Sequence, residues 1–328
     1  MPEIPTELLV LPPLALAAGI DLYLTLLFLG AVPTLTWWDR PLPGTLVALD
    51  SPAVLIAVGL FYLMEFSSER FPPVSLVWNA LQGIIRPLAG ALLALLLLDG
   101  FPLPVVLSGA VFAGALALLA HVVRSGGAIL RWLGSVKSPN RLLVSSLEDT
   151  IVLGLVSMAL DAPAHALVVS AVIVIPAAGA SPSHARAFTF AMRLALARAV
   201  RSFTPRRWMR RDDLPKWARK AVAPGLFTPG EGLRCSPAGA HRLPGAPRFA
   251  TGWVVTGGST HLFLFRAVRG HRAIALAPLL AEDLFETGFF RRLDLRTSGR
   301  RRARVIFAVD GPSGDSLRAE FVPARRVE

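Results

Sequence analysis

The stretch LLVSSLEDTIVLGLVSMAL, residues 142–160, decides the fold class, because it is apolar over nearly the length of a membrane span. A spanning helix needs roughly 17 to 25 mostly apolar residues, since the hydrocarbon core of a bilayer is about 30 Å thick. We therefore predict an all-α polytopic membrane domain of about six transmembrane helices, some short or kinked, over residues 1–180. The other five predicted spans are residues 8–32, 51–66, 81–98, 103–123 and 163–180.

The composition supports a membrane protein with a second, different part. Mean hydropathy is +0.55, and 17% of the residues are charged, whereas soluble domains carry about 25%. Residues 1–180 hold seven Lys or Arg against eleven Asp or Glu, and residues 181–328 hold twenty-seven against eleven. The two parts therefore have different surroundings. The single cysteine, Cys235, excludes an internal disulfide framework.

The distribution of basic residues predicts the orientation of the chain. With six spans, most basic loop residues lie on one side of the membrane, and Arg40 is the only one in the opposite loops. Lys and Arg concentrate in cytoplasmic loops, so both termini are predicted to face the cytoplasm. The start, MPEIPTE, has no basic residue before the first apolar run, and we expect no cleavable signal peptide. The basic loop residues on the predicted cytoplasmic side are Arg70, Arg124, Arg131, Lys137 and Arg141.

Two adjacent carboxylates, Glu148 and Asp149, interrupt the opening stretch near its start. One interpretation is structural: Ser145 to Glu148 fits the S-x-x-E capping box of a helix N-terminus, where the helix dipole favours negative charge. A helix that starts at Ser146 and ends at Leu160 rises only about 20 Å, however, which is too short to span. The other interpretation therefore places the carboxylates in a polar pocket below the headgroups.

Polar side chains in other predicted spans occur at the same depth. Charged groups inside a helical bundle are costly unless they are paired or face water. We therefore expect a network in which Arg86 pairs with Glu65 or Glu148. Individually, such residues near helix ends are more often interfacial than functional. The predicted members at this level are Glu65, Arg86, His121, Glu148 and Asp149.

Asp21 lies inside the first predicted span, two residues after Gly19. An acidic residue at that depth is a candidate proton or cation site. The structural alternative is that Asp21 pairs with Arg86 or caps a broken helix. Both alternatives remain open from the sequence.

Three motifs carry a resemblance to a known family: GIDLYLTLLFLG from residue 19, MEFSSERFPPVSLVWNALQGIIRPLAGALLA from residue 64, and ALLAHVVRSGGAILRWLGSVKSPNRLLVSSLEDTIVLGL from residue 117. Over roughly residues 10–180 the chain resembles an uncharacterised family of small bacterial integral membrane proteins, a domain of unknown function. The resemblance implies the bacterial cytoplasmic (inner) membrane and no established activity. The family usually has a basic residue where Ile20-Asp21 stand. Matching positions are Glu65, Trp78, Arg86, Pro87, Ala120, His121, Asn140, Ser146, Leu147, Glu148 and Asp149.

Residues 181–220 are predicted to form a basic amphipathic juxtamembrane helix, suited to anionic lipid head groups. Trp208 and Trp217 are candidates to anchor its continuation. No recognition motif accompanies the charge, so nucleic acid is not expected as a partner. The predicted membrane-surface residues are Arg186, Arg193, Arg198, Arg201, Arg206, Arg207, Arg210 and Arg211.

Residues 221–248 are rich in Pro and Gly and predict a linker. Residues 249–328 predict a small β-rich cytoplasmic domain, with a short helix at 278–290 and a strand at 316–322. Its His261 and His271 lack metal-ligand spacing. No catalytic motif is present. We therefore predict neither catalytic residues nor a bound metal or cofactor, and a docking or regulatory role for this domain.

Three functions remain open from the sequence. The first is a transporter or channel for a small ion or solute, through a charged cytoplasmic-side cavity. The second is a membrane scaffold whose residues 249–328 recruit a cytoplasmic protein, and a homo-oligomer is compatible with either. The third is a metal-dependent membrane enzyme. The polar residues on which the first depends are Asp21, Glu65, Arg86, His121, Asn140, Glu148 and Asp149.

Overall fold

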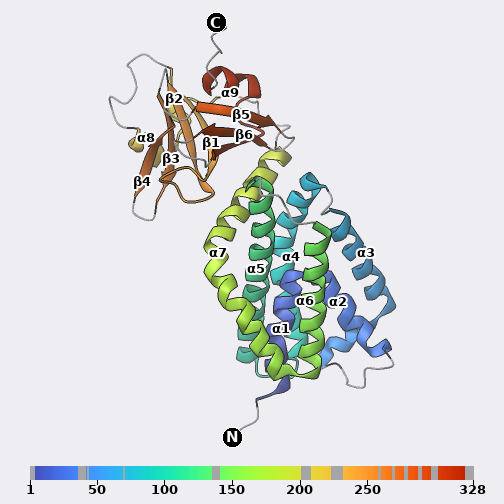
Figure 1. Ribbon diagram of the computed structural model, residues 1–328. Coiled ribbons are helices and arrows are strands. Elements are labelled where there is room, and N and C mark those ends of the chain that lie inside the picture. The colour runs from blue at the N-terminus through green and yellow to red at the C-terminus, as the bar shows by residue number, and fades with distance from the viewer. Residues whose placement is uncertain are drawn as a thin grey trace. The chain divides into compact units, whose positions relative to one another are not determined.

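The computed structural model divides the chain into two compact units, Met1–Phe188 and Thr189–Glu328, which are described separately (Figure 1). We call them the helical unit and the β unit. The structure describes residues 4–35, 42, 44–68, 71–134, 141–200, 208–222, 232–257, 260–267, 270–276, 280–286, 290–296 and 302–321.

The helical unit is built from long apolar helices joined by short turns. Four of them contain segments long and apolar enough to cross a membrane: Val77–Leu97, Leu103–Ile129, Leu143–Asp161 and Pro163–Leu194. Shorter apolar helices accompany these four. The α-helices are α1 (Thr6–Ile20), α2 (Leu22–Ala31), α3 (Pro52–Ser68), α4 (Pro72–Leu97), α5 (Leu103–Gly134), α6 (Arg141–Asp161) and α7 (Pro163–Val200), with 3-10 turns η1 (Val32–Thr34) and η2 (Gly44–Asp50).

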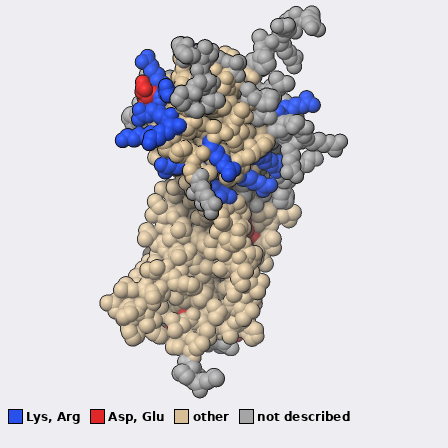
Figure 2. All heavy atoms as spheres, turned by 90° about the vertical axis from the view of Figure 1, so that its left-hand side faces the viewer, with Lys and Arg blue, Asp and Glu red and all other residues tan. Residues whose placement is uncertain are grey.

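The outward faces of these helices are apolar rather than charged. Leu88 on α4, Val111 on α5 and Ile175 on α7 are among the exposed large side chains, with 65% to 75% of their surface accessible. Figure 2 shows a face of the helical unit that is nearly free of charged side chains. Apolar surface of this extent is unfavourable in water and is matched by lipid. The helical unit therefore has the surface of a membrane domain.

Helix α1 lies at the centre of the helical unit and contacts α2, α4, α5 and α6. Every residue from Pro13 to Gly19 is buried. Small side chains let neighbouring helices approach α1 closely. A Cβ on Gly19 would lie 2.5 Å from the carbonyl oxygen of Ala117 and 2.6 Å from the Cβ of Ala120, both on α5. The α1–α5 contact therefore depends on the glycine.

The boundaries of several helices differ from the prediction. The first predicted span, 8–32, is broken at Asp21 into α1 and α2. Helix α6 begins at Arg141, so Ser145 and Glu148 lie inside it and the predicted capping box was wrong. Helix α7 runs through residue 180, where the prediction ended the last span. The Ser145–Glu148 pattern has the chemistry of a helix cap although it lies within α6, whereas the break in the first span is capped by Asp21 itself.

The β unit is one antiparallel sheet of seven strands in the order β4-β3-β2-β1-β7-β6-β5. This order places the first and last strands side by side, which ties the two ends of the unit together. The elements are η3 (Arg211–Asp213), α8 (Lys216–Ala221), β1 (Arg234–His241), β2 (Ala250–Gly257), β3 (Thr260–Arg266), β4 (His271–Ala275), β5 (Leu280–Glu286), β6 (Phe290–Arg296), β7 (Arg302–Ala308) and α9 (Gly314–Phe321).

The two faces of the sheet bury different groups of side chains. On one face, Leu317 and Phe321 of α9 join a core that includes Phe263 and Phe307. On the other face, Trp217 and Ala218 of α8 belong to a second cluster. Trp208 packs on the first cluster. The predicted membrane anchors Trp208 and Trp217 are thus both packed within the β unit.

Three element assignments in the β unit were wrong. Strand β1 lies within residues 221–248, the predicted linker, because Cys235 and Ala240 face buried clusters and the strand pairs on both edges. Strand β5 replaces the predicted helix at 278–290. Helix α9 replaces the predicted strand at 316–322, since Leu317 and Phe321 are four residues apart and share a helical face.

His241, on β1, is buried in contact with the ring of Phe249, at a centroid distance of 4.5 Å. Neither ring nitrogen has a hydrogen-bond partner among the residues that the structure describes. Burial, and then the positive charge of Arg242, lowers the pKa of His241 from 6.5 to about 4. The folded β unit therefore holds this imidazole neutral.

The stability of the β unit is expected to fall as the pH drops from 6.5 towards 4. In this window the unfolded chain binds a proton at His241 and the folded chain does not, so acid favours unfolding by up to about 3 kcal/mol. Urea unfolding of the full-length protein, followed by hydrogen exchange in β1, measures the loss. H241F is expected to flatten the pH dependence relative to H271F, a change at an exposed histidine. Identical pH dependence in both variants would contradict this assignment.

Gly19→Ala is expected to lower the stability of the helical unit by about 1–3 kcal/mol, because the added methyl group meets α5 backbone that cannot move away cheaply. Gly154→Ala is the matched control, since its Cβ would meet no atom within 4 Å. Thermal unfolding of the detergent-purified protein compares the two. The same Tm for both variants would contradict a close contact between Gly19 and α5.

Candidate functional site

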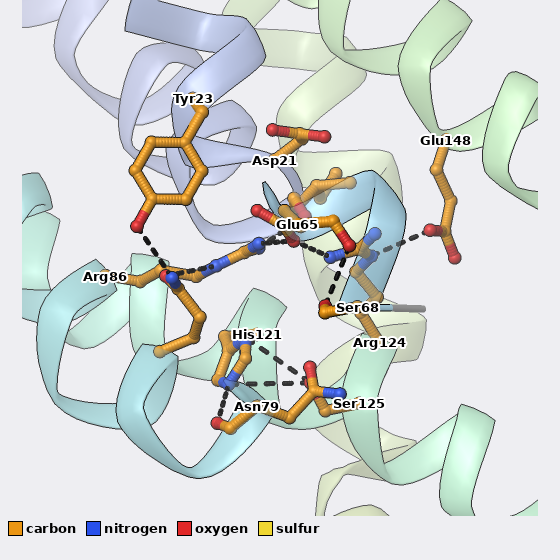
Figure 3. Close-up of polar contacts among 12 residues, drawn as sticks. Asp21, Tyr23, Glu65, Ser68, Asn79, Arg86, His121, Arg124, Ser125 and Glu148 are labelled. Carbon is orange, nitrogen blue, oxygen red and sulfur yellow. Dashed lines mark hydrogen bonds and ion pairs between the residues drawn. The ribbon is translucent and has the colours of Figure 1, made fainter. Parts of the chain in front are cut away.

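Arg86, on α4, is completely buried and forms the centre of a polar network (Figure 3). Its Nη1 donates to the carbonyl oxygens of Gly19, at 2.6 Å, and of Ile20. Its Nη2 donates to Oε1 of Glu65 on α3. The two carbonyls belong to the last turn of α1, where helices leave carbonyl groups without helical partners. One guanidinium thus caps α1 and pairs with a carboxylate.

Asp21 lies in the break between α1 and α2. Its backbone is extended, and its Oδ1 accepts a hydrogen bond of 2.9 Å from the amide of Leu24, so it is the N-cap of α2. Thr25 Oγ1 donates to the carbonyl oxygen of Asp21 at 2.6 Å. The side chain is buried. The negative end of α1 therefore meets Arg86, and the positive end of α2 meets Asp21.

Arg124, on α5, extends the network to α6. Its Nη1 lies 2.8 Å from Oε1 of Glu65, and its Nε lies 2.7 Å from Oε2 of Glu148. Oε1 of Glu65 is therefore shared by two guanidiniums. Its other oxygen, Oε2, is buried and has no hydrogen-bond partner among the described residues. A buried carboxylate oxygen without a hydrogen-bond partner lowers the stability of the fold, unless a bound ion or a group outside the described residues contacts it.

Tyrosine hydroxyls lie at two edges of the network. Tyr62 on α3 donates to Oδ2 of Asp149 at 3.4 Å, a long contact. Gln82 on α4 donates to the hydroxyl oxygen of Tyr23 at 2.8 Å and accepts from Nε of Arg86 at 3.4 Å. Six helices, α1 to α6, therefore contribute backbone or side-chain groups.

His121 belongs to a neighbouring group rather than to the ion pairs. Its Nε2 lies 3.0 Å from the backbone carbonyl oxygen of Asn79, and the hydroxyl of Ser125 donates to the side-chain oxygen of Asn79 at 3.0 Å. Figure 3 shows these three residues joined to one another and not to the carboxylates. The ring also makes an edge contact with Phe188, at 5.4 Å between centroids. Its contacts serve to join α4 and α5.

The structure brings together most of the predicted polar residues. Arg86 pairs with Glu65, one of the two predicted partners, and Glu148 joins them through Arg124. Asp21 caps a broken helix, as one of the alternatives predicted. Asn140 lies outside the described residues.

Several members of the network were not predicted from the sequence, including Arg124, which served there only to predict the orientation of the chain. The spacing of three residues from His121, which puts both on one side of α5, was the available signal. Tyr62, Gln82 and Asn79 gave no comparable signal.

The predicted membrane-surface arginines are described only in part. Arg186 and Arg193 lie on α7 and are exposed, and so are Arg210, at the start of η3, and Arg211, its first residue. The side chain of Arg198 lies outside the described part, as do Arg201, Arg206 and Arg207. Within the described residues, no three His, Cys, Asp or Glu side chains are grouped as metal ligands.

Comparison with protein families places the network in a recognised domain. Residues 8–181 match the model of a family described as "Domain of unknown function (DUF4126)". The chain belongs to this family. The match covers α1 to α6 and the whole polar network, and it ends before the β unit. No curated protein and no solved structure matches the chain.

Arg86→Met is expected to destabilise the helical unit by about 3–5 kcal/mol, since it leaves two carbonyls buried without this donor and the Glu65 carboxylate with only one of its two guanidiniums. Adding Glu65→Gln to this variant is expected to restore part of the loss, because the buried carboxylate that lost a partner is then neutral. Thermal unfolding of the two single variants and the double variant measures the coupling.

Arg234→Met is the control, since Arg234 pairs with Glu320 at 3.2 Å on the surface, where its side chain is 58% exposed. That change is expected to lower the free energy of unfolding by at most about 1 kcal/mol. Strictly additive losses for Arg86→Met and Glu65→Gln would contradict a direct buried pair.

Proposed function

We propose that the helical unit transports a small cation, or a small solute moved together with one, across the bacterial cytoplasmic membrane. The observation that carries the proposal is the charge of the network. Its described members include four carboxylates, those of Asp21, Glu65, Glu148 and Asp149, and two guanidiniums, those of Arg86 and Arg124. Asp21 and Glu65 are buried, whereas Glu148 and Asp149 are partly exposed. An excess of negative charge within and beside an apolar bundle favours the entry of a positive ion or a proton.

The broken helix supports the same conclusion. Discontinuous helices in membrane transporters place helix ends and unsatisfied backbone groups at their binding sites. Here the break between α1 and α2 holds Asp21, and the adjacent carbonyls bind Arg86. Oε2 of Glu65, in the same network, has no hydrogen-bond partner in the described part of the chain. We assign Asp21 and Glu65 as the groups that bind the cation and Arg86 as the group that positions them.

A purely structural network explains the arrangement less well. Buried ion pairs contribute little net stability, and apolar side chains of similar volume often replace them at no cost. A scaffold would need neither the unpaired oxygen of Glu65 nor a break in its central helix. We further propose that the site opens to the cytoplasmic side, on which Glu148 is expected from the positive-inside rule. The β unit is proposed to have a regulatory or docking role.

Flux measurements in liposomes test the proposal. Full-length protein is expected to conduct or exchange at least one of H⁺, Na⁺ and K⁺ above the level of empty liposomes. Asp21→Asn and Glu65→Gln are expected to reduce that flux at least tenfold, because each removes a charge that stabilises the cation. Asp99→Asn, in the exposed turn between α4 and α5, is the matched control and keeps the flux. Flux that is absent for all three ions, or unchanged in both site variants, would favour the scaffold.

A further inference from the structure

Helix α8 of the β unit has one face made entirely of positive charge. Lys216, Arg219 and Lys220 are spaced by three and four residues, so their side chains emerge on the same side. All three are exposed. None of them forms an ion pair among the residues that the structure describes. The cationic face is therefore available to a partner.

The opposite face of α8 is fixed to the sheet. Ala218 and Val222 are buried in a cluster with Leu262 and Leu264 of β3, and Trp217 packs at its edge. The guanidinium of Arg266 lies 5.6 Å from the centre of the Trp217 ring, a cation–π distance. This packing holds α8 rigidly and adds Arg266 as a fourth exposed cation. We call Lys216, Arg219, Lys220 and Arg266 the α8 basic face.

Little acidic charge offsets this face. Asp212 and Asp213 are the nearby carboxylates in sequence, and Asp213 accepts a hydrogen bond of 2.9 Å from the backbone amide of Arg210. Arg210 and Arg211 precede them and are exposed, so the segment stays strongly positive. Figure 2 shows Lys and Arg gathered over the face of the β unit that carries α8 and β4.

We propose that the α8 basic face docks onto the anionic phospholipid head groups of the membrane that holds the helical unit. Charge complementarity supports this partner, because each basic residue near an anionic bilayer strengthens binding by about fivefold. The tether supports it too. The last candidate span ends at Leu194 and α8 begins at Lys216, so even an extended chain reaches no farther than about 80 Å. The bilayer is thus always within reach of α8, at high effective concentration.

Other anionic partners fit the face less well. Single-stranded nucleic acid needs exposed aromatic rings on which bases stack, whereas Trp217 is partly buried and its ring contacts Arg266 and His271. Docking is therefore electrostatic and reversible, and it is weakened by salt. It does not depend on what the helical unit transports.

Hydrogen exchange of the full-length protein in nanodiscs tests the docking. Amides of residues 216–221 are expected to exchange about tenfold or more slowly in discs that contain phosphatidylglycerol than in discs of phosphatidylcholine alone. Salt near 1 M is expected to abolish the difference, because it shortens the Debye length to about 3 Å. This comparison uses the wild-type protein and needs no variant to fold.

Charge-reversal variants identify the residues that bind the lipid head groups. The triple variant K216E/R219E/K220E is expected to lose the lipid-dependent protection. The matched triple variant R248E/R296E/R318E changes the same charge at exposed positions of the β unit outside α8 and β4, and it is expected to keep the protection. Equal exchange in both kinds of disc, a difference that survives high salt, or an equal loss in both triple variants would each overturn the proposal.

Discussion

The contact between Arg86 and the broken end of α1 is the interaction on which the helical unit depends. A single guanidinium binds the carbonyl oxygens of Gly19 and Ile20 and the carboxylate of Glu65. Without it, the end of α1 would leave carbonyl groups unsatisfied in an apolar bundle, where each costs several kcal/mol. Because α1 contacts α2, α4, α5 and α6, its end fixes the positions of the surrounding helices. The break at Asp21 therefore persists because Arg86 on one side and the Asp21 cap on the other satisfy both helix ends.

The same contact explains why the unit tolerates so many charges. Glu65 is paired twice through one oxygen, so Arg86 and Arg124 are held close together although they repel each other. Glu148 offsets that repulsion from the α6 side. Each charge is stable only in the presence of its neighbours, which makes the network cooperative. Neutralising one carboxylate would therefore alter the electrostatic balance of the other charges in the network.

The membrane character could be predicted because the hydropathy of each segment is read directly from its residues. The pairing of Arg86 with Glu65 could be predicted because a charged side chain inside a helical bundle requires a partner of opposite charge. The sequence did not predict that Arg124 is the bridge, since a residue at the edge of an apolar segment is usually interfacial. The start of α6 was misplaced because the Ser145–Glu148 pattern has cap-like chemistry, whereas the helix begins earlier, at Arg141. In the β unit, a helix was predicted where β5 lies and a strand where α9 lies. For α9, the buried contacts of Leu317 and Phe321 override weak local preferences.

The family match and the charge distribution divide the chain at nearly the same place. The match ends at residue 181, and the strongly positive part of the chain begins there. Residues 1–180 hold more acidic than basic residues, and two of the acidic ones, Asp21 and Glu65, are buried in the bundle. Residues 181–328 hold an excess of basic residues, several of which are exposed, including those of the α8 basic face. The buried polar network and the exposed basic surface therefore belong to different parts of the chain.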